Sequence, residues 1–170
     1  MKRTTINKHE LLKPLYEAGK MVLHMVSSTP AGLMNTIPFA GSWTIAEVVS
    51  HLTKSNKAIE QSLQMKGTET PRDVKQRIEE LKKMFLDFSV KFDAPEFIWP
   101  TKAKKSKSTI MRDYKNSFKD LKGNHAGINL SEMLTLPVFG EITKLELLYF
   151  VLFHTQRHIH QLKNILEALT

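Results

Sequence analysis

The feature that most constrains the fold is a pair of helix start signals, each followed by apolar residues at helical spacing. Thr44 with Glu47, and Thr143 with Glu146, have the spacing of a capping box, in which two side chains satisfy free backbone N–H groups at a helix start. Apolar residues then recur three and four positions apart, the period of an α-helix with one buried face. After Thr44 they are Ile45, Val48, Val49, Leu52, Ile59 and Leu63. Both points therefore predict amphipathic helices.

Three further helices are expected from weaker signals. Asn7 and Glu10 also have the capping-box spacing, and Thr70 followed by Pro71 has the form of an N-cap with proline at the first helical position. A periodic apolar segment surrounds Ser108. No segment shows a sustained strand-type alternation, and no hairpin turn signal joins two apolar runs. The sequence therefore predicts an all-α fold.

Prolines and glycines gather in three stretches between the expected helices, residues 28–43, 89–107 and 123–142. These connections are longer than the roughly two to eight residues that usually join bundle helices, and connections of this length often carry function. The chain has 170 residues, which is long enough for one buried core. We therefore expect a single domain over residues 1–170.

Neither a membrane nor a secretory signal is expected. The longest uninterrupted apolar run, Leu147–Phe153, has seven residues, whereas a spanning helix needs roughly 20. Near the N-terminus the apolar stretch is broken by His24, so the core of a signal peptide does not form. A cytoplasmic location with no membrane partner is the resulting expectation.

The net charge of +8 raises nucleic acid as a partner. Only five of the 25 cationic residues are arginines, however, and arginine is the residue that reads bases and grips phosphates with two hydrogen bonds. The one lysine cluster, residues 102–107, has no aromatic residue on which a base can stack. We expect this cluster to be a solvated loop, and we do not expect a nucleic-acid partner.

The chain has no cysteine, which excludes a disulfide framework, a thiolate metal site and a cysteine nucleophile. His154 and His158 lie four residues apart on one helix face, and one cation can bridge that spacing. Arg157 is one position off this face and is expected to form a salt bridge at the bundle edge. The face continues through apolar residues, so both imidazoles are expected to point inward. Two buried imidazoles can be satisfied by a metal or, equally well, by hydrogen bonds to carbonyls or side chains. The pair alone therefore leaves both interpretations open.

A third histidine favours the metal interpretation. His51 is the only histidine on the helix that begins at Thr44, and it flanks the apolar stripe of that helix. The other histidines fit less well. His9 and His125 are expected at the surface, His160 faces away from the pair, and His24 has no histidine partner four residues away.

Other polar and aromatic residues near these histidines can each have a functional or a structural role. Glu47 lies four residues before His51, where it can orient the imidazole or act as a base, but its capping role already explains it. Gln161 shares the face of the histidine pair and can bond a ligand or a neighbouring side chain. Trp43 and Trp99 can wall a pocket, although large aromatics more often pack in a core.

Three segments together resemble the DinB-like metalloprotein superfamily. They are residues 41–52 (GSWTIAEVVSHL), 139–143 (FGEIT) and 154–161 (HTQRHIHQ). In that family a tryptophan and a small hydroxyl residue open the second helix, His-Leu follows two turns on, and H-x-x-x-H with glutamine lies on the last helix. The resemblance implies a four-helix bundle with long connections, to which residues 70–92 add an extra inserted helix.

The resemblance also implies a function. It implies a divalent metal, with zinc or nickel the usual suggestions, bound by His51, His154 and His158, and a homodimer. Three neutral imidazoles and an open position make a Lewis-acid site, and characterised relatives include thiol-dependent transferases, isomerases and hydrolases. A hydrolase or thiol-dependent transferase acting on a small substrate is the resulting expectation. A low-molecular-weight thiol would have to arrive as a cosubstrate, and the positive charge favours an anionic one. The alternative is a non-catalytic, metal-stabilised helical binding module. No further catalytic residue is identified.

Overall fold

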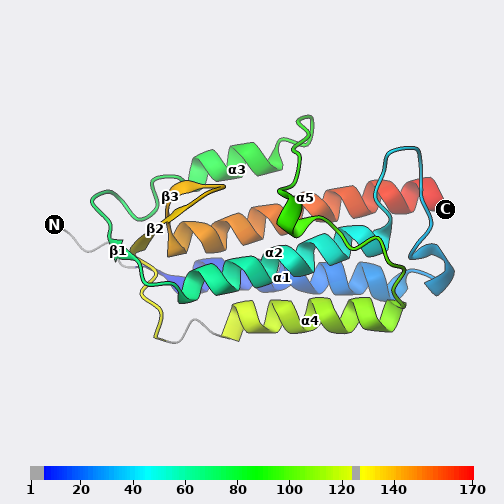
Figure 1. Ribbon diagram of the computed structural model, residues 1–170, viewed down its shortest axis with the longest axis horizontal. Helices are drawn as coiled ribbons and strands as arrows, with labels where there is room; N and C mark the ends of the chain where they lie inside the picture. Colours follow the sequence, from blue (N-terminus) through cyan, green and yellow to red (C-terminus); the bar gives the residue numbers. More distant parts are fainter. Residues whose placement is uncertain (1–5, 124–126) are drawn as a thin grey trace.

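Four long helices form a bundle in the computed structural model, which describes residues 6–123 and 127–170 (Figure 1). A shorter helix and a small sheet lie along one side of this bundle. The four bundle helices are α1 (Lys8–Ser28), α2 (Ile45–Gln64), α4 (Lys107–Gly123) and α5 (Lys144–Leu169). The added elements are α3 (Ile78–Leu86), the strands β1 (Thr68–Glu69), β2 (Glu132–Leu136) and β3 (Gly140–Thr143), and two 3₁₀ turns, Ala31–Leu33 and Glu96–Ile98.

Two of the predicted capping boxes are complete. Thr44 accepts a hydrogen bond from the Glu47 N–H at 3.1 Å, and Glu47 accepts one from the Thr44 N–H at 2.9 Å. The same reciprocal pair opens α5 at Thr143 and Glu146. The third box does not form: Asn7 caps α1 by accepting from the His9 N–H, and its side-chain amide donates to the Glu10 carboxylate. The strongest local signals therefore predicted the starts of the two helices that carry the three candidate histidines.

Helix α5 is the centre of the packing. It contacts α1, α2 and α3, whereas α4 packs against α1 and α2. Between residues 144 and 155 only Tyr149 is not fully buried. A helix surrounded by neighbours is apolar nearly all round, which explains the continuous apolar run at its start. None of the described helices combines the length and the apolarity needed to cross a bilayer.

The expected helix start at Thr70 is wrong. The Thr70 hydroxyl instead accepts a hydrogen bond from the Arg72 N–H, and Asp73 accepts one from the Lys75 N–H, so the chain turns here. Helix α3 begins only at Ile78. Local side-chain bonds of this kind compete with helix formation at the same residues that favour N-caps.

The three-stranded sheet was not expected from the sequence. Strands β2 and β3 form an antiparallel hairpin in which Leu134 faces Ile142, and both side chains are buried. Strand β1 adds to β2 with only two residue pairs. Strands of two to five residues contain too few alternations to reveal their period in a sequence. The all-α expectation therefore holds for the bundle and misses this small sheet.

The carboxylate of Glu146 joins the inserted segment to the bundle. It is fully buried and accepts two hydrogen bonds from the Arg72 guanidinium, both 2.8 Å, and one from the Arg77 N–H at 2.8 Å. The Thr143 N–H donates a fourth. Burial by itself raises the pKa of Glu146, but these hydrogen bonds outweigh it and hold the pKa below its usual range.

We expect Glu146→Gln to destabilise the fold by roughly 2–4 kcal/mol, because it leaves the Arg72 cation without its buried counter-charge. The matched control is Glu47→Gln in the other capping box. Glutamine serves equally in that motif, and the ion-pair partner of Glu47, Lys102, has a side chain that is 80% exposed, so a loss below about 1 kcal/mol is expected there. Urea unfolding measures both changes, and equal losses would contradict this account of Glu146.

Candidate metal centre

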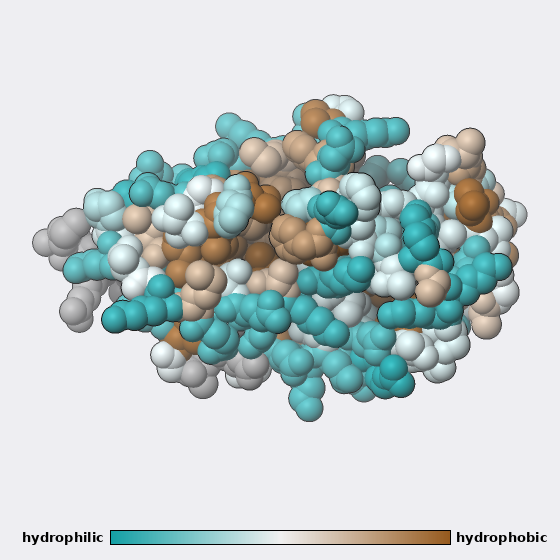
Figure 2. Space-filling model, in the orientation of Figure 1, coloured by the Kyte–Doolittle hydropathy of each residue, from teal (hydrophilic) through white to brown (hydrophobic). Residues whose placement is uncertain are grey.

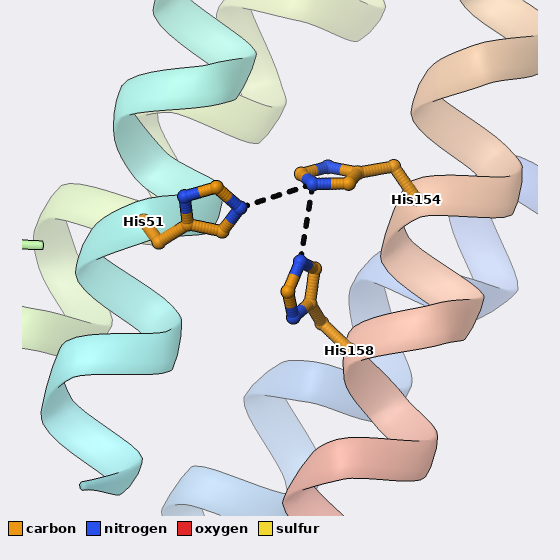
Figure 3. A group of neighbouring side chains, drawn as sticks. All are labelled: His51, His154 and His158. Atoms are coloured by element: carbon orange, nitrogen blue, oxygen red, sulfur yellow. Dashed lines mark hydrogen bonds between the residues drawn. The ribbon is translucent and has the colours of Figure 1, made fainter. Parts of the chain in front are cut away.

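Three buried histidines meet between α2 and α5 (Figure 3). His51 comes from α2, and His154 and His158 lie one turn apart on α5. The His154 Nε2 atom lies 3.0 Å from His51 Nε2 and 3.1 Å from His158 Nε2. The side chains predicted as metal ligands are thus brought together, with their candidate ligand atoms all within 4.8 Å of one another.

The outer nitrogens of two rings are held by carbonyl oxygens. His51 Nδ1 lies 2.8 Å from the backbone oxygen of Ile98, and His158 Nδ1 lies 2.7 Å from the Gln161 Oε1 atom. A carbonyl oxygen only accepts, so each Nδ1 carries the proton and each neutral ring keeps a lone pair on Nε2. Both lone pairs point toward His154 Nε2, which can supply at most one proton. A shared cation would satisfy all three inner nitrogens.

The environment keeps these imidazoles neutral. Burial is the main cause that lowers the pKa of each ring, and it lowers the pKa of His158 to about 3. The pKa of His154 lies well below its ordinary value, through burial and the two neighbouring imidazoles. Burial also lowers the pKa of His51, although the Ile98 carbonyl opposes this effect. The neutral imidazole is the form that binds metals.

The donor set fits a borderline transition metal. Imidazole nitrogen suits zinc, nickel and copper, whereas calcium and magnesium prefer oxygen ligands. Within the described part of the chain, the cluster consists of the three histidines and contains no carboxylate. A site with three protein ligands keeps a coordination position open, which is typical of catalytic zinc sites, whereas structural sites are closed by a fourth ligand.

The histidines line a cleft of about 650 Å³. Aromatic rings surround them: Trp43 lies 5.1 Å from His51, and Phe150 lies 5.0 Å from His154, between ring centroids. Phe85 of α3 contacts His154 edge-on at 6.1 Å. Figure 2 shows hydrophobic side chains gathered in the middle of the face turned to the viewer, with hydrophilic ones around them. The site therefore opens to solvent through largely apolar walls.

The polar and aromatic residues near the histidines each have a definite place in the structure. Gln161 bonds to His158, one of its two expected roles. Glu47 caps α2 and pairs with Lys102, and it is the Ile98 carbonyl that holds His51. Trp43 lines the cleft. Trp99 does not, and its indole N–H instead donates to the Ala94 carbonyl.

The expected salt bridge of Arg157 is wrong. Its guanidinium donates to the backbone carbonyls of Phe85, Asp87 and Val90, and it lies 4.9 Å from the centroid of the Phe92 ring. Carbonyl groups at the end of α3 and in the following loop have no helical partners. Arg157 satisfies them and thereby anchors this loop, a wall of the cleft, to α5.

The remaining histidines follow the expectations where the structure describes them. His9 and His24 are exposed, and His125 lies outside the described residues. His160 does not join the cluster, and its ring stacks on Phe88 with centroids 4.1 Å apart.

The Ile98 carbonyl is the functional group that the sequence did not reveal. It belongs to the segment inserted between α2 and α4, whose role was not predicted. A backbone carbonyl is present at every residue, so no sequence signal distinguishes this one. The inserted segment thus contributes to the site twice, as a cleft wall and as the group that orients His51.

Comparisons with known proteins agree with this architecture. YuaE of Bacillus subtilis is 27% identical over 139 residues, which are 80% of this chain and 85% of YuaE. Two solved structures share the fold. YfiT from Bacillus subtilis, described as a probable metal-dependent hydrolase with an unusual four-helix bundle topology, has a TM-score of 0.61 at 16% identity, over 99% of this chain and 92% of YfiT. The four-helix bundle protein TT2238 has a TM-score of 0.53 at 15% identity, over 92% of this chain and 98% of its own.

At such identities the two structures establish a common fold and nothing finer. The sequence itself is more specific, because the family profile of the DinB superfamily matches residues 15–162. This range includes the three clustered histidines and the inserted segment. With a match over most of its length and a four-helix bundle as its fold, the chain belongs to the DinB superfamily.

Proposed function

We propose that this protein is a divalent-metal-dependent enzyme that acts on a small molecule at His51, His154 and His158. One observation carries the proposal: three buried, neutral imidazoles turn their inner nitrogens toward one point, while carbonyl groups hold the outer nitrogens of two of them. Without a shared cation, at least one inner lone pair lacks a donor. A buried polar group without a partner is costly, so the arrangement favours an ion.

Zinc and nickel, the ions that the family resemblance implies, both suit three nitrogen donors, and availability in the cell decides between them. When bound, either ion supplies Lewis acidity, which polarises a carbonyl group and makes water a stronger acid. The chain's own residues orient and shield the site. Ile98 and Gln161 fix the planes of two imidazoles, and the rings of Trp43 and Phe150 pack against His51 and His154.

Hydrolysis of an ester, amide or lactone is the reaction we propose first. It requires only water beside the substrate, and the fold is shared with YfiT, described as a probable metal-dependent hydrolase. Thiol-dependent transfer is the second candidate. The chain has no cysteine, so the thiol would arrive as a cosubstrate. A closed, non-catalytic site is less well supported, because no fourth histidine or carboxylate joins the cluster within the described residues.

Partners and location remain predictions. A homodimer follows from the family resemblance, and a cytoplasmic location follows from the sequence. Nucleic acid is not proposed as a partner. In the lysine cluster, Lys102 pairs with Glu47 and Lys105 with Asp113, while Lys107 donates to two backbone carbonyls at the end of α1. These side chains are engaged within the chain.

Metal binding is the first test of the proposal. Protein purified without a histidine tag and equilibrated with zinc or nickel should hold about one ion per chain, measured by mass spectrometry of the metal after gel filtration. His154→Ala should weaken binding by about 100-fold or more, since it removes a ligand. His160→Ala is the matched control on the same helix and should leave the affinity unchanged. Equal effects of the two substitutions would contradict the assignment.

Proton release gives a second, independent test. Three exposed imidazoles with the ordinary pKa of about 6.5 would release about two protons on binding an ion at pH 6. Because burial lowers the pKa of all three histidines here, fewer protons are bound beforehand. We expect a release below about one proton, measured by calorimetry in two buffers of different ionisation enthalpy. Release of two protons would show that the imidazoles are charged in the metal-free protein.

Catalysis is tested with a panel of ester, amide and lactone substrates, beside electrophiles supplied with low-molecular-weight thiols. Metal-loaded protein should turn over at least one class, and His154→Ala should lower kcat/KM by about 100-fold or more, because it removes Lewis-acid activation. His24→Ala on α1 is the control. Turnover that survives His154→Ala would refute the metal-centred mechanism, and no turnover in any protein would favour the binding module.

A further inference from the structure

We infer that the substrate of this cleft is an uncharged small molecule with a bulky apolar body, recognised by aromatic contact and not by ion pairing. That the bound molecule is a substrate rests on the proposed function. The binding preference itself stands on the walls of the cleft and is tested without turnover.

The apolar residues that this protein exposes are concentrated at the cleft. Twelve large hydrophobic side chains are exposed among the described residues, and half of them line this one cavity. Their exposed fractions run from 39% for Met84 to 65% for Phe97. The six are Phe39, Met84, Phe88, Phe92, Phe97 and Val138. Contiguous exposed apolar surface of this kind marks a binding site, whereas scattered single residues need no explanation.

The dimensions suit a small molecule. A volume of about 650 Å³ lies within the roughly 300–1,000 Å³ of known small-molecule sites. The cavity is continuous from the exposed aromatic residues to the three histidines, which are among its lining residues. A ligand body held by the aromatic walls therefore extends to the reactive centre.

The two arginines at the cleft are already occupied. Arg157 donates to three backbone carbonyls. Arg77 donates to the carbonyls of Phe139 and Glu141 and to the Glu80 carboxylate. Four of the five N–H donors of Arg77 and three of the five of Arg157 are therefore taken by the protein's own oxygens, which leaves few for a carboxylate or phosphate.

The other charges at the cleft offer no excess of either sign. Among the described lining residues they are Lys91 and Asp93, two residues apart on the same exposed loop and opposite in charge. Together with the two arginines, the lining carries three cations and one carboxylate, so an anion is disfavoured here by the engaged arginine donors and not by the local charge.

A few polar groups remain to orient such a ligand. Ser55 lies one helical turn after His51 on α2, lines the cleft and is 4% exposed. Its hydroxyl can bond a single carbonyl or hydroxyl of a ligand beside the histidines. Apolar walls with one or two placed polar groups are the usual composition of small-molecule sites.

The test uses two fluorescent probes with the same ring system. N-phenyl-1-naphthylamine is neutral, and 8-anilino-1-naphthalenesulfonate adds one sulfonate. In 0.5 M NaCl, where long-range attraction to the basic surface is screened, the neutral probe should bind one per chain and about fivefold more tightly than the sulfonate, since the cleft offers few free partners for its charge. Tighter binding of the sulfonate would overturn the inference.

Variants locate the binding. Phe97→Ser and Val138→Ser, on two different walls, should each weaken the neutral probe by about fivefold through loss of apolar contact. Met21→Ser and Met65→Ser are controls with exposed fractions of 43% and 49% before substitution, and neither residue lines the cleft. All four positions are exposed, so the variants should fold, which circular dichroism verifies. Equal effects at all four positions would overturn the inference.

The readouts separate this inference from the proposed function. Probe binding is measured on metal-free protein, so failure of metal binding or turnover leaves it intact. Turnover without selective probe binding would leave the enzyme assignment intact and overturn the substrate class. A second copy of the chain covering the same face is the competing occupant. If the affinity for the probe falls when the protein concentration is raised to the range in which the chain dimerises, the second copy covers the cleft, and the inference is overturned.

Discussion

The buried carboxylate of Glu146 is the contact on which the rest of the structure depends. It completes the capping box of α5, accepts both donors of the Arg72 fork and receives the Arg77 N–H. One side chain thereby sets the start of the central helix and attaches the inserted segment to it. His154 lies eight residues further along the same helix, so its position relative to α3 and the cleft wall follows from this junction. A buried ion pair of this kind is costly to break from one side.

The histidine cluster is the second constraint, and it opposes stability. Three desolvated imidazoles within hydrogen-bond distance cannot all be satisfied by one another, and burial lowers the pKa of each. The fold holds two of these rings in place with carbonyl groups from Ile98 and Gln161. A functional site often contains locally unfavourable interactions, such as unsatisfied hydrogen-bonding groups, that the stability of the rest of the fold offsets. The apolar surroundings that make the cluster unfavourable in the absence of an ion also strengthen its electrostatic interactions once one is bound.

The inserted segment explains how a simple bundle obtains a cleft. Helix α3 packs on α5, Arg157 anchors the following loop through its carbonyls, and that loop returns across α2 to place Ile98 beside His51. The same loop carries Phe92 and Phe97, which form part of the exposed apolar surface. Orientation of the histidines and selection of the ligand are therefore coupled through one connection of the chain.

The sequence by itself determined the four long helices, because capping and helical periodicity are local: a hydroxyl at Thr44 or Thr143 meets an N–H three residues away whatever the rest of the chain does. Their assembly into a four-helix bundle was implied by the family resemblance. The sequence also indicated His51, His154 and His158, since two lie on one helix face and the third flanks an apolar stripe. Only the tertiary structure decided the rest. The turn at Thr70 depends on competition between hydrogen bonds two residues apart. The hairpin of β2 and β3 pairs residues only four to ten positions apart, but its strands are too short to show a period. The Ile98 carbonyl and the carbonyls bound by Arg157 have partners 47 to 72 residues away. Such contacts leave no periodic signal, because backbone groups are the same at every position and their partners meet only when the chain has folded.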